Sequence, residues 1–485
     1  MRRSIAAAAL CACLAVLLFP GKPAAPGPPR RAAAFGFDVV ISGGRVMDPE
    51  TGFDQVANIG VMGERIALIT THPIPGRLVL DASGMVVSPG FIDLCVAGRP
   101  SGPANARNIE EWKVSDGVTT VLFLHDGTGD LPAYRRMLEG AERYAHIGFS
   151  TRVWDYLYRG LTLEEKLDLV RANLESGALG VSVSPEYTPE VDTGELLAYG
   201  RVAREHGVPL FLHLRYSSRE RELEGVAEAV RVALETGAHV HIFHLPSTGG
   251  TYHMDRALDM IRRARRRGAR IDADLYAYTY WATYINAARF NPGWQQRYGL
   301  TYQDLFYVPT REYLTEASFN RYRRRGGLIV VPENTMSLER SLLPALREDF
   351  VYIASDSACG VPFGGEVPST GHPRGTNNFA RALGLSREAG IPLMDMLRKM
   401  TLGPARVMEG TDPSFRRRGR LQEGCYADIT VFDYRQVDGE GTVLDRAVPS
   451  LGIHAVLVGG RVVYRDGELG EAGAGRFLLR SPEAP

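Results

Sequence analysis

The sequence is poor in cysteine, and its opposite charges cancel. Only five cysteines occur among 485 residues, and two of them lie in an apolar N-terminal run. The other three, Cys95, Cys359 and Cys425, are too few and too widely spaced for a disulfide scaffold, although a single Cys95–Cys359 bridge stays open. Lys+Arg and Asp+Glu number 56 each, so a formal net charge of zero gives no electrostatic reason to expect nucleic acid as a partner.

The N-terminal apolar run is too short to cross a membrane. It covers residues 5–19, directly after the basic start MRRS, whereas a spanning helix needs about 20 apolar residues. A basic start with a short apolar run is typical of an export signal. We expect residues 1–34 to be a signal and linker, which predicts a periplasmic or extracellular protein with no membrane span when mature. An uncleaved or lipid-linked anchor is the alternative, because Cys13 in LCAC loosely resembles a lipidation site.

The two ends of the chain share a strand-and-turn pattern that the middle of the chain lacks. Both ends have apolar stretches interrupted by Gly-Gly turns, and each alone has too few strands for a stable core. We therefore expect residues 35–86 and 403–485 to form one small β-sandwich. Residues 87–402 alternate eight short apolar runs with amphipathic helical stretches. This pattern predicts an α/β fold, a closed (β/α)8 TIM-like barrel.

Polar residues stand where three of the predicted barrel strands end. His213 ends VPLFLH, His244 ends HVHIFH, and Asp356 ends FVYIASD. Period-two alternation predicts that Val240, Ile242 and His244 share one strand face. A lone histidine at a strand end is usually an ordinary hydrogen-bonded residue. Two at consecutive strand ends, with a later aspartate, predict a zinc site with an open position for water and an acid–base group beside it.

Several motifs follow one another along residues 37–467: DGVTTV, GALGVSVSPEYTP, HLRYSS, HIFHLPST, FNPGW, IASD and HPRGTNNFAR. Together they resemble the amidohydrolase superfamily, and within it the D-aminoacylase and N-acyl-D-glutamate deacylase branch. The resemblance implies a metal-dependent barrel with a β-sandwich made by both chain ends. It implies metal ligation by His213 and His244, acid–base catalysis by Asp356, and a contact of Tyr187 with a substrate carboxylate.

Two arginines and one of two tyrosines are further candidate substrate contacts. Arg215 and Arg374 carry guanidinium groups that suit carboxylates, with a structural ion pair as the alternative for each. Residues 271–299 are rich in aromatics and predict a long loop over the barrel mouth, in which Tyr278 or Tyr276 is a candidate contact. Asp274, at the start of this stretch, is expected at most to orient a neighbouring histidine.

The first predicted barrel strand departs from the family pattern. Where the family has Asp-Leu-His-x-His, this chain has Cys95 and Ala97. A Cys95 thiolate can ligate metal, whereas Ala97 cannot. In the second strand VLFLHDG offers His125 or Asp126 as a third ligand, depending on register. The chain has only four lysines, none at a predicted strand end, so a carbamylated lysine that bridges two metals is not expected.

We therefore expect about one zinc ion per chain, held by His213, His244 and either His125 or Asp126. The predicted function is cleavage of the C–N bond of an N-acyl (D-)amino acid or similar small amide. An inactive barrel that binds a small ligand or an envelope partner is the alternative, because the histidine pair is missing. Chemistry with Cys95 as nucleophile is a third. Pro246 stands where the branch commonly has a carboxylate-binding lysine, so its specificity is not assumed.

Overall fold

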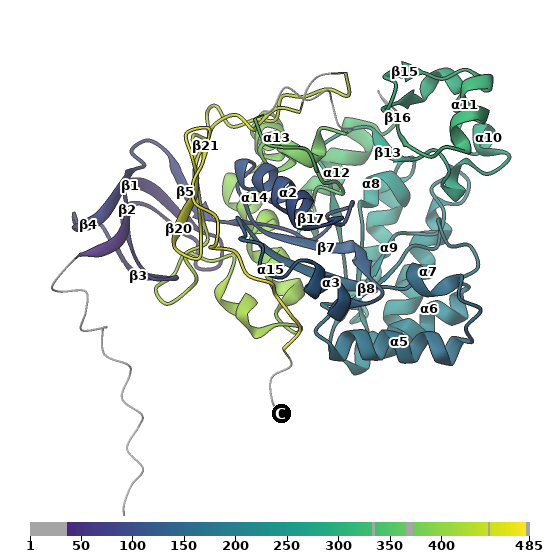
Figure 1. The fold of residues 1–485 in the computed structure, drawn as a ribbon, viewed down its shortest axis with the longest axis horizontal. Coiled ribbons are helices and arrows are strands. Elements are labelled where there is room, and N and C mark those ends of the chain that lie inside the picture. Colours follow the sequence, from purple (N-terminus) through teal and green to yellow (C-terminus); the bar gives the residue numbers. More distant parts are fainter. Residues whose placement is uncertain (1–35, 332–334, 365–371, 445–446, 482–485) are drawn as a thin grey trace, which may run out of the picture.

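The computed structural model describes residues 36–331, 335–364, 372–444 and 447–481, which form a barrel, a β-sheet domain and a small inserted sheet (Figure 1). The expected signal and linker lie outside the described residues. The barrel sheet has the order β17-β12-β11-β10-β9-β8-β7-β6, and every neighbouring pair is parallel. Its strands are β6 (Phe91–Asp93), β7 (Val118–Thr128), β8 (His146–Arg152), β9 (Val181–Val183), β10 (Pro209–Leu212), β11 (His239–Ile242), β12 (Ile271–Leu275) and β17 (Val351–Ile353). Each lies in one of the eight predicted runs, so the predicted barrel is confirmed.

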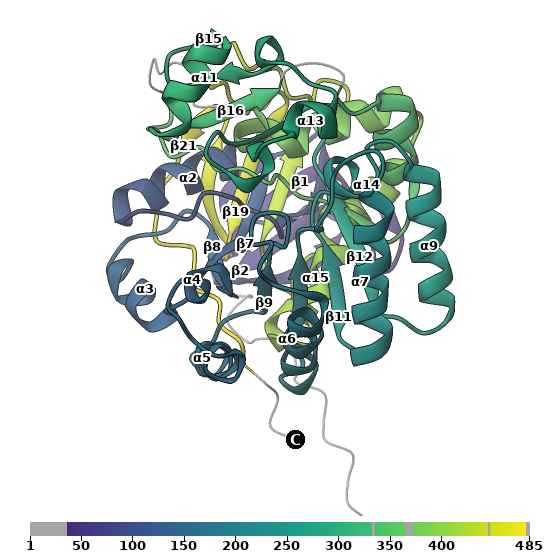
Figure 2. The same ribbon diagram turned by 90° about the vertical axis from the view of Figure 1, so that its right-hand side faces the viewer.

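Amphipathic helices cover the barrel strands. Helices α5 (Leu163–Glu175), α6 (Thr193–Glu205), α7 (Glu222–Thr236) and α9 (Met254–Arg266) lie side by side along one flank (Figure 2). On the other side lie α2 (Pro103–Ser115), α3 (Leu131–Met137), α13 (Arg374–Glu388) and α14 (Leu393–Met400). No helix within the described ranges is long and apolar enough to cross a membrane.

Both chain ends contribute to one nine-stranded sheet, as the sequence predicts. The N-terminal strands are β1 (Phe37–Asp48), β2 (Phe53–Met62), β3 (Arg65–Thr70), β4 (Gly76–Asp81) and β5 (Val86–Pro89). The C-terminal strands are β18 (Ile429–Phe432), β19 (Ile453–Val458), β20 (Arg461–Arg465) and β21 (Glu468–Leu469). Antiparallel pairing of β5 with β18 joins the two ends. Side chains from both ends share an apolar cluster, so neither end has a complete core without the other.

The run predicted as the first barrel strand is divided between the two domains. Its first half is β5 of the β-sheet domain, and the barrel strand β6 begins only at Phe91. Gly90 lies between them, where a Cβ atom would come within 2.3 Å of the Thr119 side chain. Only glycine fits this close approach, so the chain changes sheets there.

The aromatic-rich stretch after β12 folds as a small sheet rather than a loop. Strands β13 (Trp281–Tyr284), β14 (Phe306–Tyr307), β15 (Glu312–Tyr313) and β16 (Leu328–Val331) pair antiparallel, with helices α10 (Trp294–Tyr298) and α11 (Glu316–Arg323) beside them. Its aromatic side chains pack into an apolar cluster of their own, which includes Trp281, Phe290, Trp294 and Phe319. The aromatics of this cluster are therefore structural, and they give the insertion an apolar core of its own.

Within the described part of the chain, the first and last barrel strands do not pair with each other, and contacts that involve side chains link them. The Lys113 ammonium group on α2 lies 3.0 Å from Asp93 Oδ2 and 2.6 Å from Ser355 Oγ. The Ser355 amide donates to Asp93 Oδ1 at 3.0 Å. The side chains of Lys113 and Asp93 are only 1% and 0% exposed. One of the few lysines thus closes the barrel.

Replacing Lys113 by methionine is expected to lower the free energy of unfolding by about 3–5 kcal/mol, because the Asp93 charge would stay buried without its partner. Denaturant unfolding measures the loss. Arg231→Met is the control, since Arg231 and Glu235 form an ion pair with side chains 56% and 46% exposed, and its loss should have little effect. Equal stability of both variants would contradict the closing role of Lys113.

Candidate active site

Three histidines meet at the carboxyl end of the barrel strands. His125 lies near the end of β7, while His213 and His244 follow β10 and β11. One ring nitrogen of each histidine lies within 4.8 Å of the other two. The His213 and His244 ring centres are 4.8 Å apart, and the His125 ring is 5.8 and 5.7 Å from them. The structure thus brings together three possible metal ligands from β7 and from the ends of the neighbouring strands β10 and β11.

His244 reaches this position by a left-handed turn of the backbone. The predicted alternation is wrong here: β11 ends at Ile242, and Val240 and Ile242 pack in the cluster between barrel and helices. On the opposite face of β11, His241 points into the barrel against Phe211. His244 itself has φ 34° and ψ 55°, so its side chain is aimed by the turn after the strand rather than by the strand.

His125 and Asp126 have different surroundings. The pairing of β7 with β8 is irregular between Phe123 and Thr128, and a bulge of this kind re-aims side chains. It places the His125 ring beside the other two histidines. The Asp126 carboxylate instead accepts a hydrogen bond from the Gly98 amide at 2.7 Å, and it lies outside the histidine group. Of the two alternatives for the third ligand, the structure brings His125 to the site.

The hydrogen bonds of the three histidines suit a divalent metal. His213 Nδ1 lies 2.9 Å from the Leu214 carbonyl oxygen and must donate to it, which leaves Nε2 with a free lone pair. His244 Nδ1 lies 3.1 Å from Ser247 Oγ, so the same tautomer is available there. Neither ring nitrogen of His125 has a hydrogen-bond partner among the described residues, but Asp126 Oδ1 lies 3.5 Å from Nδ1 and raises the pKa of His125 against the effect of burial. Burial lowers the pKa of His213 and His244 well below 6.5, so both are neutral, as metal ligands must be.

Asp356 lies beside this group. Its Oδ2 is 3.8 Å from His244 Nε2 and 2.8 Å from Arg374 Nη2. The backbone has φ 48° at Asp356, and its amide donates to the Cys95 carbonyl oxygen at 2.6 Å. Burial raises the pKa of Asp356 above its ordinary 3.8, while Arg374 opposes this rise. A buried carboxylate with a raised pKa is suited to taking up and releasing a proton.

Cys95 is near Asp356 but is not suited to the roles considered for it. Its side chain is fully buried, and Sγ lies 3.9 Å from Asp356 Oδ1. Burial raises the pKa of the thiol well above 9.0, and the charges of Asp274 and Asp356 raise it further. Because the thiolate is the form that ligates metals and attacks substrates, this raised pKa disfavours both roles for Cys95. It packs in the apolar cluster inside the barrel.

We expect Cys95→Ala to leave the metal content per chain unchanged and to retain turnover, because a thiol that stays protonated contributes only packing. Elemental analysis and amide hydrolysis measure the two quantities. In the unmodified protein, Cys95 should resist alkylation until the chain is unfolded. Loss of metal in Cys95→Ala would instead indicate that the Cys95 thiolate is a metal ligand, and loss of all turnover with metal retained would indicate that it is the nucleophile.

Two arginines near the histidines are buried with unused donors. Arg374 is 3% exposed, and its Nε and Nη1 have no hydrogen-bond partner among the described residues. Arg289, from the inserted segment, is 5% exposed, and its Nε is also unpartnered within the described chain. Arg289 Nη1 lies 4.0 Å from Glu186 Oε2, and Glu186 Oε2 lies 3.7 Å from His213 Nε2. Buried donors without partners are costly, so they indicate a place for an anionic ligand.

Arg289 and Glu186 are not among the residues predicted from the sequence. Glu186 stands next to the predicted Tyr187, and Arg289 directly precedes the FNPGW motif. Their closeness to these motifs is the only feature of the sequence that could have drawn attention to them. Tyr187 itself is at the site: its ring centre is 4.6 Å from that of His213. Its hydroxyl lies 3.1 Å from Thr283 Oγ1 on β13, which ties the insertion to the barrel.

Two of the candidate substrate contacts, Arg215 and Tyr278, are engaged elsewhere, whereas the Tyr276 ring lies 6.4 Å from that of His244. The Arg215 guanidinium makes a two-pronged ion pair with Glu228, through Nε at 2.9 Å and Nη2 at 3.0 Å. This is the structural alternative given for Arg215, and it leaves the group few free donors. The Tyr278 hydroxyl donates to Asn377 Oδ1, and its ring contacts the His372 ring at 5.2 Å. Neither residue belongs to the histidine group.

The chain is similar in sequence to known amidohydrolases. A profile of the amidohydrolase family matches residues 351–464. The N-acyl-D-glutamate deacylase of Alcaligenes xylosoxydans xylosoxydans is 28% identical, covering 88% of this chain and 93% of that protein. The D-aminoacylase of the same organism is 29% identical, covering 92% and 98%.

Solved structures of the same kinds of enzyme are also similar to this chain. N-acyl-D-glutamate deacylase from Bordetella bronchiseptica, complexed with zinc and a phosphonate mimic of the reaction's tetrahedral intermediate, has a TM-score of 0.75 at 25% identity. This match covers 92% of this chain and 100% of that one. A crystal structure of D-aminoacylase has a TM-score of 0.71 at 23% identity, with the same coverage, and supports the fold.

Proposed function

We propose that this chain, which belongs to the amidohydrolase superfamily and resembles its D-aminoacylase branch, is a zinc-dependent hydrolase that cleaves the amide bond of N-acylated amino acids. The observation that carries the proposal is the group of His125, His213 and His244 with Asp356 beside it. Three imidazoles would hold one zinc ion and leave a fourth position open, the arrangement of catalytic rather than structural zinc.

In the proposed hydrolysis, different residues of this chain would hold the metal, transfer the proton and orient the acid–base group. A zinc ion held by the three histidines would acidify a water molecule and polarise the amide carbonyl. Asp356 takes the proton of the attacking water on its carboxylate and passes it to the leaving nitrogen. The guanidinium of Arg374 orients this carboxylate through the 2.8 Å contact with Oδ2. Tyr187 lies against His213 and is held by Thr283 of the insertion, so it is placed to contact a substrate bound at the histidines.

A carboxylate on the substrate would satisfy the unused donors of Arg374 and Arg289. Their unpartnered nitrogens, Nε and Nη1 of Arg374 and Nε of Arg289, are buried around the same site. Guanidinium groups bind carboxylates in a planar, two-pronged geometry. N-acyl-D-amino acids are therefore the first class to test, since relatives with this fold are deacylases of such compounds by name.

We further propose that the protein acts outside the cytoplasm, because the apolar run over residues 5–19 after a basic start is typical of an export signal.

The test is elemental analysis of the purified full chain, followed by a panel of N-acyl-D- and N-acyl-L-amino acids. About one zinc per chain, with hydrolysis of at least one acylated amino acid, is the expected result. Amides without a carboxylate are the matched control and should be cleaved more slowly. No zinc after supplementation, or zinc without turnover of any amide, would favour the alternative of an inactive barrel that binds a ligand.

A further inference from the structure

A chain of four polar side chains, three of them buried and the outermost, His239, partly exposed, runs along β11 and β12 through the barrel. His239 Nε2 lies 2.7 Å from Asp272 Oδ2, and His241 Nδ1 lies 2.6 Å from Asp272 Oδ1. His241 Nε2 then lies 3.0 Å from Asp274 Oδ2. The chain alternates histidine and aspartate, so every carboxylate has an imidazole donor.

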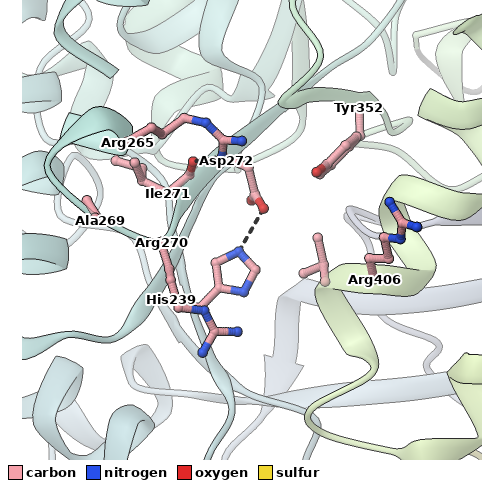
Figure 3. Close-up of a pocket in the computed structure, with 10 residues that line it drawn as sticks. His239, Arg265, Ala269, Arg270, Ile271, Asp272, Tyr352 and Arg406 are labelled. Carbon is pink, nitrogen blue, oxygen red and sulfur yellow. Dashed lines mark hydrogen bonds and ion pairs between the residues drawn. The ribbon is translucent and has the colours of Figure 1, made fainter. Parts of the chain in front are cut away.

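The outer end of this chain faces a pocket at the amino ends of the barrel strands. The pocket has a volume of about 370 Å³ and is lined by His239, Asp272, Arg265, Arg270, Tyr352 and Arg406. Figure 3 shows the hydrogen bond between His239 and Asp272, with Tyr352 and Arg406 across the open space. The outer end of the chain therefore lies at the opposite end of the strands from the three histidines.

The inner end of the chain holds the backbone of a proposed metal ligand. Asp274 Oδ1 accepts the hydrogen bond of the His244 amide. His244 has φ 34°, a left-handed conformation that is unfavourable for a residue with a side chain. Such conformations persist only where surrounding contacts enforce them. The Asp274 carboxylate supplies one of these contacts, and the conformation it enforces turns the His244 ring toward His213.

The middle of the chain keeps the Asp274 carboxylate in place. Against the effect of burial, Asp272 and Asp274 raise the pKa of His241 to about 9, which favours an imidazolium between these two side chains. Charge-assisted hydrogen bonds of this kind are shorter and stronger than neutral ones. His241 is fully buried, and its ring packs against the rings of Phe211 and Phe243.

We propose that His239, Asp272, His241 and Asp274 form a positioning relay, which fixes the backbone of His244 so that its ring can bind metal together with His125 and His213. The inference rests on the proposed metal site. It adds four residues that touch neither metal nor substrate and act through His244. Asp274 acts directly on His244, His241 holds Asp274, and the outer pair holds His241.

The test is the zinc affinity of full-length variants, measured by competition with a chelator, together with the melting temperature of the metal-free protein. Asp274→Asn is expected to weaken zinc binding about ten- to a hundredfold, the range typical of residues that orient metal ligands. His241→Gln and Asp272→Asn should show smaller losses, and His239→Gln the smallest, because each acts through one more contact. The visible spectrum of the Co²⁺-loaded protein should change in the same order.

His146→Gln is the matched control. It removes a buried His–Asp pair of similar kind, His146 with Asp428 at 3.1 Å, which has no link to His244. It should lower the melting temperature and leave zinc affinity unchanged. Wild-type zinc affinity in Asp274→Asn and His241→Gln, with lowered melting temperatures, would overturn the relay. If Asp274→Asn does not fold, His241→Gln and Asp272→Asn decide in the same way. Wild-type protein that takes up no zinc would instead overturn the proposed function, and the relay with it.

Discussion

Asp356→Asn should lower kcat/KM by about 10²–10⁴-fold, the range that a positioned acid–base group contributes. Asparagine has the shape of aspartate and tolerates a positive φ, so the backbone turn at φ 48° can persist. Its oxygen can still accept from Arg374 Nη2. What it cannot do is take a proton from water and give it to the leaving nitrogen. The measurement is steady-state kinetics on the fastest amide of the acylated amino acid panel.

Zinc content and melting temperature separate loss of chemistry from loss of structure in this variant. Both should stay near wild-type values, because Asp356 lies outside the group of three histidine ligands. Turnover by Asp356→Asn close to that of wild type would exclude Asp356 as the acid–base group. Loss of zinc along with turnover would assign Asp356 to the metal instead.

The strands and the composite β-domain are readable from the sequence because they depend on local patterns. Short apolar runs between amphipathic helices mark the barrel, and the two ends each lack strands that the other supplies. The directions in which the side chains of the site point cannot be predicted from such patterns. The direction of the His244 side chain is set by a backbone turn after β11, and that of His125 by an irregularity in β7. Period-two alternation describes only regular strands, so it cannot predict either direction.

Tertiary contacts explain the other differences. Arg289 lies in an insertion whose motif gives no sign that one side chain is buried near His213, because only the folded insertion places it there. The resemblance alone makes the loss of the histidine pair at Cys95 and Ala97 look severe. In the structure, Cys95 is part of the apolar interior of the barrel, while three histidines from other strands make up a ligand group without it.

His125→Ala should abolish tight zinc binding and, with it, amide hydrolysis. Catalytic zinc commonly has three protein ligands, and the substitution would leave only His213 and His244. The expected loss of zinc affinity exceeds the roughly 10–100-fold that changes to residues around the ligands cause. Elemental analysis after dialysis, and chelator competition for any zinc retained, measure it. Turnover should fall in parallel, because Asp356 has no acidified water from which to take a proton.

Asp126→Asn decides between the two neighbouring candidates for the third ligand. The asparagine oxygen can still accept the Gly98 amide, so the turn at Gly98 should persist and the fold with it. Because Asp126 Oδ1 also lies 3.5 Å from His125 Nδ1, a modest loss of zinc affinity is expected, well below that of His125→Ala. The reverse order, with zinc lost in Asp126→Asn and kept in His125→Ala, would mean that β7 presents the carboxylate to the metal. One pair of variants thus tests whether the irregularity in β7 supplies the ligand that the missing histidine pair does not.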